Sequence, residues 1–114
     1  MMNEFKTVVI TDSNFQAEVM DCTKPILLEF WAEWRGANHI LEPILQALAL
    51  KYYDQIKIGK LDIDRNQKIV DRFSIYSMPT ILFFKHGRVI DSVQGTVPSR
   101  ELEEKILALL SETT

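Results

Sequence analysis

The sequence predicts an α/β fold in which a mixed five-stranded central sheet carries helices on both faces. Strand-like and helix-like segments alternate along most of the chain. The helices between the early strands are long enough to be crossovers, which makes those strands parallel, and a short turn near the end makes the last two strands antiparallel. At 114 residues we expect one domain, covering residues 1–114, with a core that needs no disulfide.

The first half of the chain begins with a short strand over residues 5–10, where β-branched side chains are common. Phe15, Val19 and Met20 then recur at the spacing of a helix. Residues 26–32 form an almost unbroken apolar run without alternation, which predicts a strand buried on both faces.

A second helix is expected to begin near Ala37 and to contain Pro43, which should kink it because proline removes a backbone donor. Residues 56–63 alternate as a strand does. Residues 67–73 then predict a short helix, with an apolar stripe toward the core.

The last part of the chain predicts a hairpin and a final helix. Residues 80–84 and 89–93 are the two strands, and residues 85–88 are the turn between them. The final helix places four apolar side chains on one face: Leu102, Ile106, Leu109 and Leu110.

Composition disfavours several classes of function. The net charge is −3, from 13 basic and 16 acidic residues, without a basic cluster to neutralise nucleic-acid phosphates. The longest apolar stretch is far shorter than the ~20 residues that span a bilayer, and the N-terminus does not resemble a signal peptide, so we expect a cytoplasmic protein. Cys22, His39 and His86 have no ligand spacing, so neither a metal nor a cofactor is predicted.

Several ordered motifs resemble the thioredoxin family across nearly the whole chain. They are Phe30-Trp31-Ala32-Glu33-Trp34-Arg35-Gly36-Ala37-Asn38, Glu42-Pro43-Ile44-Leu45, Lys60-Leu61-Asp62-Ile63-Asp64, Met78-Pro79-Thr80 and Gly95. The resemblance implies the thioredoxin fold.

The resemblance also implies a redox site that this chain contains only in part. The family has Trp-Cys-Gly-Pro-Cys where the second strand ends; one thiolate attacks a substrate disulfide and the second thiol resolves the mixed intermediate. Here Arg35 and Asn38 occupy the two cysteine positions, and neither side chain can act as a thiolate. Cys22, the single cysteine, is placed by the resemblance after the first helix and away from Trp34.

The resemblance further implies a binding groove around a cis Met78–Pro79 peptide bond, whose backbone pairs with an extended substrate in the family. The groove residues transferred by position are Trp34, Ile63, Ser77, Met78, Pro79, Gly95 and Thr96. Two interpretations stay open: the groove binds a protein or peptide without needing a thiol, or Pro79 only shapes the fold.

Two charged features are also candidates. Glu29 interrupts the buried strand and Lys60 shares the apolar face of its own strand, so we expect a buried ion pair or a pair joined by water. In the family an aspartate at the Glu29 position transfers a proton to the resolving cysteine. Arg35 at the start of the second helix either binds an anion or extends into water.

We therefore favour a redox-inactive, non-enzymatic thioredoxin-like module that binds a protein or extended peptide in the cis-proline groove. The alternative is a thiol–disulfide oxidoreductase-class protein in cell redox homeostasis, acting as a monothiol through Cys22 or with a partner's thiols. A third hypothesis is a homodimer that uses an apolar patch near Trp34 or an edge strand.

Overall fold

The computed structural model describes residues 7–33 and 38–111, without the side chains at positions 38 and 39. Its elements in chain order are β1 (Val8–Val9), η2 (Gln16–Met20), β2 (Ile26–Trp31), α1 (Asn38–Lys51), β3 (Lys57–Asp62), α2 (Gln67–Arg72), β4 (Thr80–Lys85), β5 (Arg88–Gln94) and α3 (Ser99–Ser111). This order matches the predicted alternation of strands and helices.

The strands of the described residues form one sheet in the order β1-β3-β2-β4-β5. β1 and β2 run parallel to β3, whereas β4 runs antiparallel to both β2 and β5. The turn of the β4–β5 hairpin places His86 and Gly87 at φ 53° and 76°, the left-handed conformation that a tight two-residue hairpin turn needs. The mixed five-stranded sheet predicted from the sequence is therefore confirmed.

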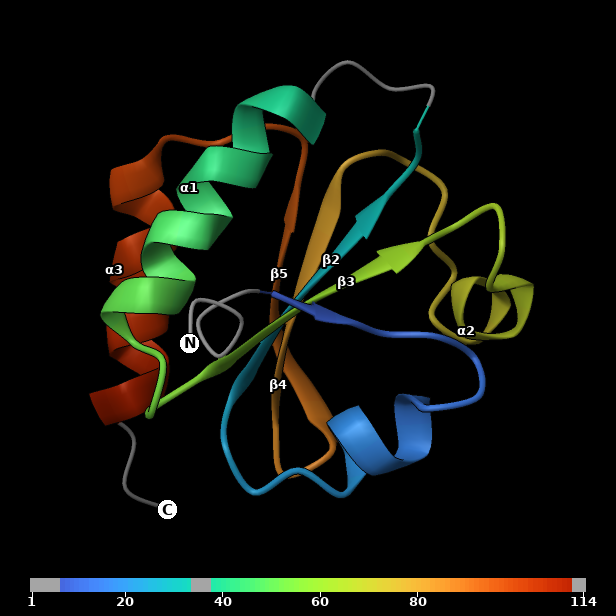
Figure 1. Cartoon of the computed structure of the whole chain (residues 1–114), viewed down its shortest axis with the longest axis horizontal. Helices are drawn as coiled ribbons and strands as arrows, with labels where there is room; N and C mark the ends of the chain where they lie inside the picture. The colour runs from blue at the N-terminus through green and yellow to red at the C-terminus, as the bar shows by residue number, and fades with distance from the viewer. Residues whose placement is uncertain (1–6, 34–37, 112–114) are drawn as a thin grey trace.

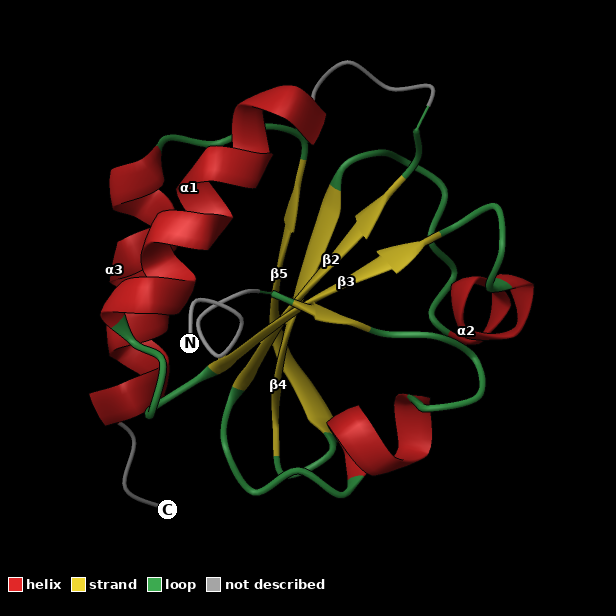
Figure 2. Cartoon of the chain, viewed as in Figure 1, coloured by secondary structure: helices red, strands yellow, loops and turns green. Residues whose placement is uncertain are grey.

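Helices cover both faces of the sheet. α1 and α3 lie together on one face, and η2 and α2 lie on the other (Figures 1 and 2). Leu27 of β2 packs in the cluster under α1 and α3, whereas Leu28 and Phe30 pack in the cluster under η2 and α2. Because both faces of β2 are buried, its sequence shows a continuous apolar run instead of alternation.

The short elements on the η2/α2 face differ most from the prediction. β1 contains two residues instead of six, although residues 5 and 6 lie outside the described part of the chain. The first predicted helix is a five-residue π-helical turn, η2. Pro43 lies within α1, as predicted.

The first backbone N–H groups of α2 are hydrogen-bonded by Asp12, a residue far earlier in the chain. The Asp12 carboxylate accepts hydrogen bonds from the backbone N–H groups of Lys68 and Ile69, at 3.2 and 3.0 Å. The buried Asn66 side-chain oxygen in turn accepts a hydrogen bond from the Asp12 N–H at 2.8 Å. These bonds satisfy donors that a six-residue helix leaves unpaired.

Candidate functional site

Three distant segments meet near the end of β2, where the groove is predicted. Phe30 of β2 pairs with Thr80 at the start of β4, and Thr80 pairs with Gln94 at the end of β5. This register places the Met78–Pro79 step beside Gly95. The Met78–Pro79 peptide bond is cis. We call this end of the sheet the cis-proline edge.

Hydrogen bonds hold the backbone around the cis bond. The Pro79 carbonyl accepts a hydrogen bond from the Gly95 N–H at 2.8 Å, and the Ser77 carbonyl accepts one from the Thr80 hydroxyl at 2.6 Å. Within the described part of the chain, the backbone N–H and carbonyl of Met78 make no hydrogen bond. Met78 therefore offers a donor and an acceptor to an extended chain laid beside it.

The other predicted groove residues lie at the same edge where the structure describes them. Ile63 directly follows β3 and is half-buried, and its N–H donates a hydrogen bond to the Trp31 carbonyl at 3.0 Å. Ser77 and Thr96 are exposed. Trp34 lies outside the described residues. The contribution of these residues to binding stays a prediction.

The charged pair expected between Glu29 and Lys60 is not a direct ion pair. The two residues are register partners on β2 and β3, but the Lys60 ammonium donates to both carboxylate oxygens of Glu42 on α1, at 3.0 and 3.1 Å. The Lys60 side chain is 23% exposed and that of Glu42 is 39% exposed, whereas Glu29 is 2% exposed. Lys60 therefore pairs where both ions stay partly hydrated, which costs less free energy than a pair within the core.

The two carboxyl groups beside Lys60 have pKa values that move in opposite directions. The pKa of Glu29 is raised to about 7, mainly because burial disfavours the charged form and also because Glu42 repels it, while Lys60 opposes the shift. Burial alone would raise the pKa of Glu42, but hydrogen bonds from Gln46 and Lys60 outweigh burial and lower it. Glu29 can therefore exchange a proton near neutral pH, as a general acid or base must.

Cys22 lies at the opposite end of β2 from the cis-proline edge. It belongs to the loop before Ile26, and its half-buried side chain packs against the apolar cluster under η2 and α2. The four-residue step from Ile26 to Phe30 spans about 13 Å of strand. Cys22 and Pro79 therefore belong to separate surfaces.

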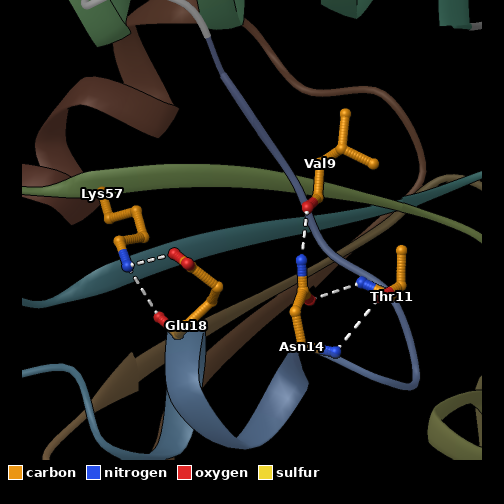
Figure 3. Close-up of polar contacts among 5 residues, drawn as sticks. All are labelled: Val9, Thr11, Asn14, Glu18 and Lys57. Carbon is orange, nitrogen blue, oxygen red and sulfur yellow. Dashed lines mark hydrogen bonds and ion pairs between the residues drawn. The ribbon is translucent and has the colours of Figure 1, made fainter.

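The segment that leads to Cys22 is fixed to the sheet by its polar side chains (Figure 3). The Lys57 ammonium donates to the carboxylate and to the backbone carbonyl of Glu18, at 2.8 and 2.9 Å. The Asn14 side chain accepts from the Thr11 N–H at 2.7 Å and donates to the Val9 carbonyl at 2.9 Å. These bonds hold η2, and hence the start of the Cys22 loop, in one position on β1 and β3.

The remaining sequence predictions concern an anion site at Arg35, metal binding and a membrane span. Arg35, and with it the predicted anion site, lies outside the described residues, as does the side chain of Asn38. No group of three or more potential metal-ligating side chains occurs within residues 7–33 and 38–111. In the same residues, no helix is both long enough and apolar enough to cross a membrane.

Comparison with known proteins identifies the family. The thioredoxin family model matches residues 6–108. The chain belongs to the thioredoxin family. It is 40% identical to the thioredoxin of Chlorobaculum thiosulfatiphilum, an alignment that covers 84% of this chain and 89% of the relative. It is 37% identical to thioredoxin 1 of Synechococcus elongatus, covering 82% and 87%. It is also 40% identical to the chloroplastic M-type thioredoxin of Pisum sativum, covering 86% and 57%.

These relatives correct the function predicted from the sequence. From Arg35 and Asn38 at the two cysteine positions, the sequence predicts a redox-inactive binding module. However, the relatives are named thioredoxins, and the alignments cover most of the length of each of them. The likeness therefore favours the alternative, a thiol–disulfide oxidoreductase-class protein, over the redox-inactive module. The prediction was wrong because it relied on two positions, whereas the family match extends over residues 6–108.

Sequence reasoning missed Glu42 as the partner of Lys60. The two are 18 residues apart on different elements, and only the packing of α1 onto β3 brings them together. The sequence offers one signal, a glutamate in a predicted helix and a lysine on a predicted strand. That signal does not separate Glu42 from Glu29 until the depth of each side chain is known.

Proposed function

We propose that this chain takes part in thiol–disulfide exchange on protein substrates, as a member of the oxidoreductase class that maintains cell redox homeostasis. The observation that supports this most strongly is the thioredoxin match over residues 6–108, together with 40% identity to a named thioredoxin. The likeness to bacterial thioredoxins supports a cytoplasmic location, although the relative from Pisum sativum is named chloroplastic.

Cys22 is the thiol that this chain can contribute, since it is the single cysteine of the sequence. Its thiolate attacks one sulfur of a protein disulfide; that S–S bond breaks, a Cys22 mixed disulfide forms, and the released sulfur takes a proton from water. A low-molecular-weight thiol then attacks the Cys22 sulfur, releases the second substrate thiol and forms a mixed disulfide with Cys22. A second small thiol attacks that mixed disulfide at the sulfur of the small thiol, which releases Cys22 and leaves the disulfide of the two small thiols. Two external thiols thus supply the two electrons that reduce the substrate.

The test is a disulfide-exchange assay with a fluorescently quenched, disulfide-linked peptide pair and glutathione as the second thiol. The chain should accelerate exchange above glutathione alone, and Cys22→Ser should return the rate to that baseline. Mass spectrometry should detect glutathione or peptide attached at Cys22. Thr23→Ala, a change at the neighbouring exposed residue, should keep the activity and serves as the matched control.

Glu29 favours a second arrangement of the same function, in which a partner protein supplies the thiols at the cis-proline edge. A buried carboxyl with a pKa of about 7 lies on the strand that leads to the cis-proline edge, where this chain has no thiol of its own. Such a group suits proton transfer to or from the thiol of a docked partner. In that arrangement the partner supplies both thiols, and the groove residues Ile63, Met78 and Pro79 position its chain.

The same assay separates these arrangements. Acceleration that survives Cys22→Ser but falls in Glu29→Gln supports partner thiols at the cis-proline edge. If the wild-type chain never exceeds glutathione alone, and adding a dithiol peptide changes nothing, thiol–disulfide exchange is not its function.

A further inference from the structure

A pocket lies beside β1 on the sheet face that carries α1 and α3, and it reaches Trp31 and Asp62 at the ends of β2 and β3, next to the cis-proline edge. Val9 pairs with Lys60 across β1 and β3, and Lys60 and Trp31 belong to neighbouring strands. The pocket has a volume of about 370 Å³ and includes Val9, Thr11, Trp31, Lys60, Arg65 and Asn66 in its lining. This volume lies within the range of small-molecule sites.

The floor of the pocket is an uncovered part of the apolar sheet. Val9 is 63% exposed although it lies on a strand, because the helices α1 and α3 pack farther along the sheet, over β2, β3 and β4. The partly buried Trp31 ring lines the same pocket. A flat apolar ring placed there would remove both surfaces from water, which is favourable in proportion to the area buried.

The charges around this floor favour an anionic group on the ligand. The Arg65 side chain is 83% exposed, and its nearest ion-pair contact joins its Nε to an Asp62 oxygen at 3.8 Å, too long for a hydrogen bond. Within the described part of the chain, the Arg65 guanidinium makes no hydrogen bond, so its planar donors can bind a carboxylate or sulfonate in two-point fashion.

A second cation disfavours a positively charged ligand. The Lys60 ammonium lies 5.4 Å from the centre of the Trp31 ring, so the aromatic surface already has a cation above it. Two of its hydrogen-bond contacts go to Glu42, and an ammonium has three N–H donors. Asp62 is the opposing negative charge in the lining, and it lies between the two cations in sequence.

We propose that this pocket binds a small aromatic anion, with the ring on Val9 and Trp31 and the acidic group on Arg65, assisted by Lys60. The site uses neither Cys22 nor the Met78–Pro79 step, although Trp31 and Asp62 lie at the same end of the sheet. The binding test below measures no thiol chemistry, so its outcome is distinguishable from that of the disulfide-exchange assay.

The probe is 8-anilinonaphthalene-1-sulfonate, an aromatic sulfonate whose emission rises when it leaves water. Its uncharged relative N-phenyl-1-naphthylamine tests the contribution of the acidic group. Titration of the full chain should give saturable binding of the sulfonate. Amide NMR shifts should be largest at Val9, Thr11, Arg65 and Asn66 and at the Trp31 indole.

Three single substitutions test the roles assigned to pocket residues, and a fourth is the control. Arg65→Gln should weaken sulfonate binding about five-fold, the size expected for one exposed charge contact, and should leave binding of the uncharged relative unchanged. Asp62→Asn should strengthen sulfonate binding, because it removes the repelling carboxylate. Val9→Ser should weaken both probes. Arg100→Gln, at an exposed arginine on α3, should change neither and is the matched control.

The opposite directions of Arg65→Gln and Asp62→Asn distinguish a defined site from general dye adsorption. Equal affinity of both probes for the wild-type chain, or NMR shifts confined to other surfaces, would overturn the proposal. So would an Arg65→Gln variant that binds the sulfonate as tightly as the Arg100→Gln control does.

Discussion

The two ends of β2 differ in what they offer to a thiol–disulfide reaction. Within the described residues, the cis-proline edge has an unpaired backbone donor and acceptor at Met78, and Glu29 lies on the strand that leads to it with a pKa of about 7. In the sequence, Arg35 and Asn38 occupy the positions of the two family cysteines. The opposite end has the thiol, Cys22, in a loop fixed through Lys57 and Glu18.

This difference separates two features that thiol–disulfide exchange needs: the unpaired Met78 backbone lies at one end of β2, and the Cys22 thiol lies at the other within the described residues. The register of the sheet places the Met78–Pro79 step beside Gly95. A chain can therefore keep the family's architecture while its one thiol lies on another surface.

The largest expected effect comes from returning both thiols to the cis-proline edge. In a Cys22→Ser background, Arg35→Cys combined with Asn38→Cys should raise the disulfide-exchange rate at least about a hundred-fold above the wild-type chain. The reason is that a resolving thiol in the same molecule replaces a bimolecular step. The glutathione-coupled peptide assay measures the rate.

Each single cysteine variant in that background is the control, because it supplies one thiol without an internal resolving partner. Equal rates for the double variant and the wild-type chain would mean that the cis-proline edge no longer accepts a substrate disulfide. The comparison between the two ends would then lose its basis.

An intermediate effect is expected from Glu29 on stability. Its folded-state pKa of about 7 lies above the ordinary value of 4.5, so the folded chain retains a proton that the unfolded chain releases between these values. The stability from this group is therefore present below pH 4.5 and is lost as the pH rises through 7. Glu29→Gln, which stays neutral, should be more stable than the wild-type chain at pH 8 by about 2 kcal/mol.

Urea unfolding at pH 5 and pH 8 measures this difference, and near pH 5 the two chains should be much closer in stability. Asp64→Asn, at an exposed carboxyl after β3, is the control and should show no comparable change between the two pH values. A Glu29→Gln variant that is equally destabilised at both pH values would show that Glu29 is charged in the folded chain.

The smallest effect concerns the end of β2 that contains the thiol. Lys57→Met removes the bonds to Glu18; the Lys57 side chain is 21% exposed and that of Glu18 is 38% exposed. The substitution should lower the free energy of unfolding by about 1 kcal/mol. The Cys22 loop should then open more often, so that Cys22 reacts several-fold faster with an aromatic disulfide reagent. Lys68→Met, at an exposed lysine on α2, is the control. An unchanged Cys22 rate would show that η2 does not limit access to the thiol.

The sequence pattern was sufficient for the order of the elements, and the resemblance to the thioredoxin family implied the segments that meet at the cis-proline edge. Periodicity identified the helices, and the apolar run at residues 26–32 identified the strand that is buried on both faces. The helices and strands depend on local pattern, which one sequence shows directly.

The partner of Lys60 and the pocket beside β1 could not be predicted in the same way. Lys60 faces both Glu29 and Glu42, and only the relative depth of the two carboxyl groups decides which of them binds it. The pocket exists because the helices end short of β1 and leave Val9 uncovered, a matter of packing between elements that are distant in the sequence.

The contact between Asp12 and α2 also has a consequence for the order of folding. A helix of six residues is not stable alone in water, and its first backbone donors are bonded by a carboxylate 56 residues earlier in the chain. We therefore expect α2 to form after β1 has docked on β3, as a late element of the fold rather than a nucleus. Under native conditions, the slow amide protons of α2 and β1 should exchange together, as one cooperative unit.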